Sequence, residues 1–388
     1  MFTLTKVRVG TGGFHVNKVY EGLYMSRRNL FLLLYSLGIG FVICLFMGVI
    51  LLFDGRTVYA WFERRFVPQL IQASTATVPT QVVIVPAAPL PSATITPTPR
   101  CGGPPYMVLV LLGTDSRSDS YQAGLADSIR LVRVDFIDPG IMVLPFQRDL
   151  YVEIPGIADH GITHGKLNQG YTYGTPAFGY YDAPNRGLGL MEVTMEHNFG
   201  AKVDHGIAIN MQSFVRIVDA LGGIDVHLPY AIDGRVRNSR DPALYFAAGE
   251  QHLDGRRTQI LARLRPQGDF ERTNTQTLIL RALSSKLLSP EVLPRLPELI
   301  SAFQDSIYTD LEPAQIAQLT CLAVRLDPQK ITYVNFPENL FEGTRVRDPV
   351  LGNTFIFDAD FDVLRSYVAS FMDGNWPGES LMTPAPAP

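Results

Sequence analysis

One long segment without charge constrains this chain most. Residues 30–53 read LFLLLYSLGIGFVICLFMGVILLF, which is 24 residues without an Asp, Glu, Lys, Arg or His. A helix rises about 1.5 Å per residue, so the segment covers about 36 Å, more than the roughly 30 Å hydrocarbon core of a bilayer. A cleaved signal peptide would have a shorter apolar region and a small-residue cleavage site, which residues 54–56 do not offer. The sequence therefore predicts a retained transmembrane helix at 30–53.

The charges beside this segment predict its orientation. Residues 1–29 carry five Lys or Arg and one Glu, and Arg27 and Arg28 lie directly before the apolar segment. The positive-inside rule places such a flank in the cytoplasm. We therefore expect residues 1–29 to be cytoplasmic, and the rest of the chain to lie outside a plasma membrane that it crosses once. Membrane lipid around the helix is then a predicted partner.

Three further segments have compositions unlike a folded core. Residues 54–72 form a juxtamembrane segment, either a short interfacial helix or the end of the membrane helix, because Trp61 and two arginines suit the headgroup region. Residues 73–105 are rich in Pro, Thr and Ala without a helical period, which predicts an extended stalk. Residues 376–388 end in TPAPAP and are expected to be a disordered tail.

The remaining residues, 106–375, have the periodicity of a single α/β domain. Continuous apolar runs and alternating runs predict strands, and apolar residues at helical spacing predict helices. The turn Asp138-Pro139-Gly140 between two such strands predicts a hairpin. We expect an α/β/α domain with a central mixed β-sheet flanked by helices. The expected strands are 107–113, 128–137, 140–146, 206–210 and 331–336, and the expected helices 188–199, 211–221, 273–288, 312–326 and 358–372.

Composition excludes several classes of protein. The net charge is −4, and subtracting the basic cytoplasmic flank leaves −8 for the outer part. A general nucleic-acid binder needs a positive field, so nucleic acid is excluded as a partner. An anionic ligand must instead be held by a local cluster. Of three cysteines, Cys44 lies in the apolar segment, and we predict a disulfide between the other two, Cys101 and Cys321.

Carboxylates gather around the first two strands of the domain. Asp115 and Arg117 follow the strand that ends LLGTDSR, and Asp127 opens the next strand. The end of a strand is where α/β folds place ligand groups, although an Asp in a turn is also common. Two carboxylates on one rim can bind Mg²⁺ or Mn²⁺ together with substrate phosphates.

Arginines gather in two later segments. Arg148 lies in PFQRDLYV, and Arg263, Arg265 and Arg272 lie in LARLRPQGDFERTNTQ. Arg263 and Arg265 share a side if their segment is extended, and Arg272 and Gln276 share a helix face. The planar donors of arginine suit phosphate or pyrophosphate, whereas a solvated charged face is the alternative.

As an ordered set, these segments resemble the LytR–CpsA–Psr family of bacterial cell-envelope proteins. The resemblance covers about residues 106–290, and the single span with a short cytoplasmic segment also fits. Its motifs in this chain are LGTDSR, ADS, PFQRDLYV, HGKLNQGY, IVDALGGIDV, HLDGRRTQILARLR and DFERTNTQ.

The resemblance implies a membrane-anchored extracytoplasmic phosphotransferase. Such a protein moves a polyprenyl-(pyro)phosphate-linked glycopolymer onto a cell-wall acceptor such as peptidoglycan, assisted by Mg²⁺. Asp115 or Asp127 could take the proton of the acceptor hydroxyl, and the Leu-rich segment 278–288 could line a slot for the lipid or be plain core. The implied catalytic residues are Asp115, Asp127, Arg148 and Arg263, the metal ligands Asp115 and Asp127, and the pyrophosphate-binding residues Arg117, Arg148, Arg263, Arg265, Arg272 and Gln276.

One departure from the family pattern bears on activity. Where the family often has Arg-Gln, this chain has Thr275-Gln276, so one guanidinium for the phosphate is missing. An alternative function is therefore a non-catalytic cell-envelope protein that binds polyprenyl pyrophosphate or a glycolipid. Regulation of transcription is disfavoured by the outward topology and the acidic domain.

Overall fold

The computed structural model describes residues 97–235 and 239–376. None of the helices in these two ranges is long and apolar enough to cross a membrane. The predicted cytoplasmic segment, the transmembrane helix at 30–53, the juxtamembrane segment and residues 73–96 of the stalk lie outside the described residues. So do residues 377–388 of the predicted tail.

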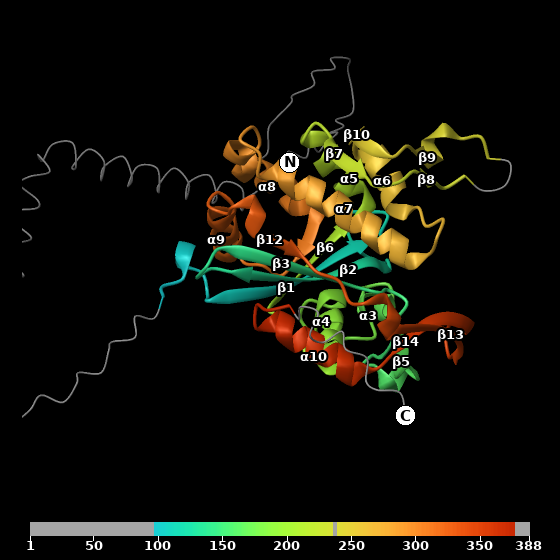
Figure 1. The fold of residues 1–388 in the computed structure, drawn as a ribbon. Coiled ribbons are helices and arrows are strands. Elements are labelled where there is room, and N and C mark those ends of the chain that lie inside the picture. The colour runs from blue at the N-terminus through green and yellow to red at the C-terminus, as the bar shows by residue number, and fades with distance from the viewer. Residues whose placement is uncertain (1–96, 236–238, 377–388) are drawn as a thin grey trace, which may run out of the picture. The chain divides into compact units, whose positions relative to one another are not determined.

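A six-stranded mixed sheet forms the centre of the domain, with the strand order β11-β6-β1-β2-β3-β12 (Figure 1). β1 is antiparallel to β2 and parallel to β6, and β3 is antiparallel to β2 and parallel to β12. This arrangement confirms the expected α/β class with a mixed sheet. The strands are β1 (Tyr106–Thr114), β2 (Ala126–Asp135), β3 (Gly140–Phe146), β6 (His205–Asn210), β11 (Ile307–Thr309) and β12 (Ile331–Tyr333).

Helices cover both faces of this sheet. Figure 1 shows α3, α4 and α10 on one face and α5, α6 and α7 on the other. Alternation along β1 explains both layers, because Val108 and Leu112 are fully buried in the core under the first face, whereas Leu109 packs toward the second. The helices are α3 (Leu167–Thr172), α4 (Gly187–Phe199), α5 (Met211–Ala220), α6 (Gly255–Arg263), α7 (Asp269–Leu287), α8 (Leu296–Phe303), α9 (Pro313–Ala323) and α10 (Phe361–Met372).

Capping residues fix where the main helices begin and end. Asn210 precedes α5 and accepts a hydrogen bond from the Ser213 amide, and Asp360 caps α10 in the same way. Gly200 ends α4 with a φ of 67°, a left-handed conformation that glycine adopts without strain. Each of the five expected helices is present, and α7 begins at Asp269, four residues before the predicted start.

The structure also contains elements that the pattern did not predict. Helix α6 was not predicted; it ends at Arg263, and Leu264 after it is extended, so the segment that carries Arg263 and Arg265 is part helix and part extended chain. β13 has a largely exposed sequence, FEGTRVRD, without a clear alternation, whereas β7 (IDVHL) does alternate but is only five residues long. These further strands are β4 (Tyr151–Glu153), β5 (His164–Lys166), β7 (Ile224–Leu228), β8 (Ile232–Asp233), β9 (Tyr245–Phe246), β10 (Gly249–Leu253), β13 (Phe341–Asp348) and β14 (Gly352–Ala359).

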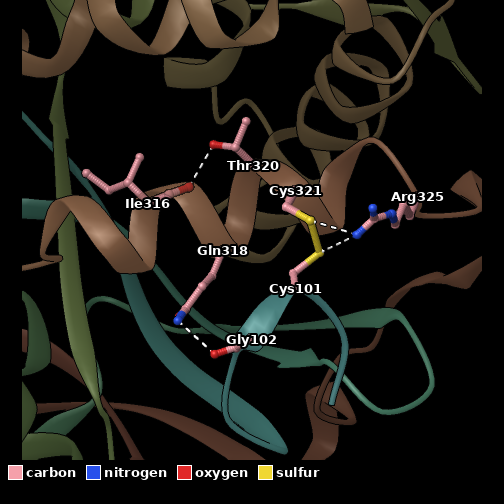
Figure 2. Close-up of a disulfide and its surroundings, with 7 residues drawn as sticks. All are labelled: Cys101, Gly102, Ile316, Gln318, Thr320, Cys321 and Arg325. Atoms are coloured by element: carbon pink, nitrogen blue, oxygen red, sulfur yellow. Dashed lines mark hydrogen bonds between the residues drawn. A yellow bond between two sulfur atoms is a disulfide. The ribbon is translucent and has the colours of Figure 1, made fainter. Parts of the chain in front are cut away.

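A disulfide fastens the start of the domain to α9. Cys101 and Cys321 form the pair expected from the sequence, with their Cα atoms 5.9 Å apart. Arg325 donates to both sulfurs and Gln318 donates to the carbonyl oxygen of Gly102, as Figure 2 shows. The amide of Arg100 also donates to the carbonyl of Phe136 at 2.7 Å. The folded domain therefore begins near residue 100, inside the segment predicted as stalk.

We predict that the variant Cys321→Ser lowers the free energy of unfolding by about 2–4 kcal/mol, because the bond closes a long loop of the unfolded chain. Chemical denaturation of the full-length chain measures the effect. The double variant Cys101→Ser/Cys321→Ser should be no less stable than Cys321→Ser alone, since both lack the same bond. Two free thiols in the unreduced wild-type domain would contradict the pairing.

Candidate active site

A cavity of about 340 Å³ lies between the sheet and the helices α5, α6 and α7. It opens at the edge where the parallel strands β1, β3 and β6 end and the antiparallel strand β2 begins, the usual place for ligands in α/β folds. One part of its lining is charged or polar and another is aliphatic. The charged or amide residues are Asp127, Arg130, Arg148, Asn210, Gln259, Arg263, Arg265, Arg272 and Gln276, and the large apolar ones are Leu111, Leu112, Ile209, Met211, Phe214, Ile279, Leu280 and Leu283.

Asp127 reaches the cavity because of a β-bulge. Gly113 pairs with Ser128 but Thr114 pairs with Ala126, so Asp127 is an extra residue on β2. A bulge re-aims the side chain of the extra residue and is common beside active sites. The Oδ1 atom of Asp127 accepts a hydrogen bond from Nη1 of Arg148 at 2.6 Å.

Arg148 follows β3 and is held by three carboxylates. Besides Asp127, its Nε donates to Asp149 at 3.2 Å, and its Nη2 lies 3.6 Å from Asp269. Burial disfavours its charge, but the carboxylates of Asp149 and Asp127 outweigh burial and raise the pKa of Arg148 above its ordinary value. The guanidinium is therefore fixed in position and fully charged.

Asp149 is a positioning residue for this arginine. It is 5% exposed, and Lys166 donates to its second oxygen at 2.8 Å. Burial favours the neutral acid, but the hydrogen bond from Lys166 and the charge of Arg148 together hold the pKa of Asp149 below its ordinary value. Lys166 and Asp149 both stand in motifs identified in the sequence, where neither received a role.

Asp269 gathers arginines at the first turn of α7. Its Oδ1 lies 3.0 Å from Arg272 and 3.4 Å from Arg265, in addition to its contact with Arg148. An acid in the first helical turn is favoured by the helix dipole. Arg272 is 6% exposed, and its Nε has no hydrogen-bond partner among the described residues. Burial and repulsion by Arg148 lower the pKa of Arg272.

Helix α6 brings Arg263 to the cavity. Asp254 caps this helix, and Gly255 lies so close to Val215 of α5 that a Cβ atom would overlap its carbonyl oxygen. Asp219 of α5 also accepts a hydrogen bond from the Gly255 amide at 2.7 Å. Arg263 at the end of α6 is exposed, and within the described ranges it has no ion pair.

Arg130 is a site residue that the sequence analysis passed over. It lies in the middle of β2, is 2% exposed and lines the cavity. Its three hydrogen bonds go to neutral oxygens, those of Ile129, Thr273 and Gln276, at 3.2–3.3 Å. Burial and repulsion by Arg272 lower the pKa of Arg130 to about 9. The sequence feature that could have identified Arg130 is its place in an otherwise apolar predicted strand, where a charged side chain is unusual.

Two predicted site residues do not line the cavity. Asp115 is exposed, and its Oδ1 accepts a hydrogen bond from the Leu125 amide at 2.6 Å. Arg117 is exposed, without an ion pair to any residue that the structure describes. The other six, Asp127, Arg148, Arg263, Arg265, Arg272 and Gln276, come together around the cavity.

Asp115 and Asp127 are the residues that the sequence predicts as magnesium ligands. In the two described ranges no group of three or more His, Cys, Asp or Glu could hold a metal. Asp115 and Asp127 each accept a hydrogen bond at Oδ1, and their Oδ2 atoms accept none from the described residues. Mg²⁺ is commonly bound by one or two carboxylates together with water and substrate phosphates, and Asp127 on the cavity offers one such oxygen.

The cavity combines positive charge with an apolar wall. Five arginines line it, and among the lining residues that the structure describes Asp127 is the one carboxylate. Arginine forks bind phosphate oxygens strongly, and apolar side chains bind hydrocarbon. Such a cavity suits an amphiphile with a multiply charged anionic head.

Several curated proteins are similar to this chain. A transferase of Enterococcus faecalis named polyisoprenyl-teichoic acid–peptidoglycan teichoic acid transferase TagU is 29% identical over 213 residues, 53% of this chain and 62% of that protein. The TagV protein of Bacillus subtilis, with the corresponding name, is 24% identical over 260 residues, 66% of this chain and 61% of that protein. The chain thus spans about six-tenths of the length of these relatives.

Solved structures share the fold. The crystal structure of B. subtilis TagV matches with a TM-score of 0.53 and 22% identity, over 70% of this chain and 98% of that one. A structure of TagT bound to LIIa-WTA matches with a TM-score of 0.50 and 18% identity, over 69% and 90% of the two chains. A sequence model of the LytR_cpsA_psr family matches residues 102–360, which is most of the described domain. The chain therefore belongs to the LytR–CpsA–Psr family.

Proposed function

We propose that this protein is a phosphotransferase of the cell envelope. It moves a glycopolymer from a polyprenyl pyrophosphate carrier to a hydroxyl group of a cell-wall acceptor such as peptidoglycan. The observation that carries this proposal is the cavity itself, in which an arginine cluster adjoins an apolar wall. The relatives named as teichoic acid transferases support the same class of reaction.

The two parts of the donor match the two parts of the cavity. The pyrophosphate fits beside Arg148, Arg263 and Arg272, whose guanidinium groups would bind its oxygens. The first isoprene units of the lipid fit along Ile279 and Leu283, which belong to the Leu-rich segment of α7. A predicted membrane helix at 30–53 would keep the domain close to the lipid carrier, since that carrier stays in the bilayer.

The reaction needs no covalent protein intermediate. The acceptor oxygen forms a bond to the sugar-bearing phosphorus, the bond from that phosphorus to the lipid phosphate breaks, and polyprenyl phosphate leaves. The acceptor proton passes to solvent at the rim, because a donor and the ion would occupy both oxygens of Asp115 and of Asp127. Arg148 and Arg272 stabilise the charge on the phosphates, and positioning supplies the rest of the acceleration.

Asp115 and Asp127 are the residues that we assign to Mg²⁺. When bound, the ion would neutralise charge on the pyrophosphate oxygens. The hydrogen bond from Arg148 fixes the orientation of the Asp127 carboxylate and leaves its second oxygen for the ion. The exposed position of Asp115 leaves room for water among the ligands.

We predict that Arg263→Ala lowers kcat/KM for transfer about 10–100-fold, the effect of one lost charged hydrogen bond to the transferred group. Release of lipid phosphate from a prenyl-pyrophosphoryl sugar, with peptidoglycan fragments as acceptor, measures the rate. Arg263 is exposed and unpaired within the described ranges, so its removal should leave the melting temperature unchanged.

Arg256→Ala is the matched control, because Arg256 is exposed on the same helix and does not line the cavity. It should retain the wild-type rate. Equal rates for both variants would refute the assignment of Arg263. If the wild-type protein binds the prenyl-pyrophosphoryl sugar but releases no lipid phosphate, the enzyme proposal is wrong. The protein would then be a non-catalytic binding protein.

We also predict that EDTA abolishes transfer and that added Mg²⁺ or Mn²⁺ restores it. The variant Asp115→Asn should need about tenfold more Mg²⁺ for half-maximal rate, because a neutral amide is a weaker ligand than a carboxylate. Initial rates across a magnesium titration measure this shift. Full activity in the presence of EDTA would exclude the metal from the mechanism.

A further inference from the structure

The positive charge of Arg130 is not balanced by any protein carboxylate that the structure describes. Its side chain is fully buried, and its three acceptors are the carbonyl oxygens of Ile129 and Thr273 and the amide oxygen of Gln276. Its Nε donates to no described residue. The ionisable groups that influence it most are Arg272, which repels it, and the Tyr333 hydroxyl, whose charge is present only at high pH. A buried charge without a partner is costly for a fold.

The position of Arg130 in the cavity indicates which ligand group could balance its charge. Arg130 pairs across the sheet with Leu111 on the apolar wall, and it contacts Gln276 on α7. On that helix Gln276 lies between Arg272 of the charged cluster, one turn before, and Ile279 of the apolar wall, one turn after. Arg130 therefore stands at the boundary between the two parts of the cavity.

Two more residues of this cavity carry a buried polar atom without a partner among the described residues. The Nε of Arg272 and the hydroxyl of Thr114 are both buried and have no hydrogen-bond partner among the described residues. Both residues line the same cavity. Buried polar groups in native proteins are nearly always satisfied, so unsatisfied groups around a cavity point to a polar ligand.

We propose that Arg130 binds the phosphate that carries the lipid tail, which is the leaving group of the proposed reaction. In an amphiphile whose tail lies on the apolar wall, this phosphate is the charged group at the boundary. The inference rests on the proposed function and adds to it a specific role for Arg130. Thr275, where the family often has an arginine, is buried and does not line the cavity, so Arg130 on β2 supplies a guanidinium from a different element.

Binding of farnesyl phosphate and farnesyl pyrophosphate to the full-length chain tests this role. The variant Arg130→Met should bind both ligands about 10–100-fold more weakly, because both contain the phosphate next to the tail. Its melting temperature should be unchanged or higher, since an unbalanced buried charge is replaced by an apolar side chain. If Arg130 had only a structural role, Arg130→Met would bind both ligands with wild-type affinity and would have a lower melting temperature.

Arg133→Met is the matched control on the same strand. Arg133 faces the other side of the sheet, where it pairs with Asp135 at 3.0 Å and donates to the Met372 carbonyl. This variant should lose stability and retain wild-type affinity for both ligands. Arg130→Gln, which keeps hydrogen-bonding capacity without charge, provides a second variant should Arg130→Met fail to fold.

The outcomes separate the two proposals. If the wild-type protein binds neither farnesyl ligand, the proposed function falls and the role of Arg130 falls with it. If the wild-type protein binds them and a folded Arg130→Met or Arg130→Gln variant binds them with equal affinity, only the role of Arg130 is overturned. Weaker binding by the folded Arg130 variants, with Arg133→Met unaffected, supports the role.

Discussion

Repulsion among clustered guanidinium groups is the constraint that the cavity of this domain must meet. Five arginines line one cavity, and three carboxylates hold part of that charge in place: Asp127, Asp149 and Asp269. Each carboxylate comes from a different segment, so the ion pairs depend on the start of β2, the end of β3 and the start of α7 meeting at one edge of the sheet. Arg130 stands outside these pairs. The carboxylates offset enough of the repulsion for the arginines to lie together. The remaining positive charge allows the cavity to bind a multiply charged anion.

Several motif residues act only by positioning others. Lys166 donates to Asp149, which in turn orients Arg148. Asp254 caps α6 and Asp219 accepts the Gly255 amide, so two separate motifs fix the helix that ends in Arg263. A second core, which includes Val218, Ile224, Leu261 and Ile279, packs α5, α6 and α7 against β7 and β10. The helical side of the cavity is therefore part of a packed layer, which holds Arg148 and Arg272 within reach of the same Asp269 carboxylate.

The sequence was sufficient for the central architecture because its strands are strongly apolar and its main helices are capped. It predicted five of the six strands of the central sheet (β1, β2, β3, β6 and β12, but not β11), the helices α4, α5, α7, α9 and α10, and the pair Cys101–Cys321. It missed α6, because the polar segment HLDGRRTQ hides a short helix whose position depends on contact with Val215. It also passed over Arg130, since pattern reading treats an arginine in an apolar strand as an interruption. Only the assembled sheet shows that this side chain is buried beside α7 and pairs with no acid of the described residues.

The difference between Arg130 and Arg133 shows how one strand can serve stability and binding at once. The two arginines are three residues apart on β2 and so point to opposite faces of the sheet. Arg133 meets Asp135 and a helix carbonyl, and its charge is balanced by the protein. Arg130 donates to neutral oxygens, and no carboxylate of the described residues balances its charge. In a cavity with an apolar wall, where water screens little, an unbalanced guanidinium attracts an anion far more strongly than it would at the surface. The unbalanced charge of Arg130 thus lowers the stability of the free protein and strengthens its binding of a phosphate.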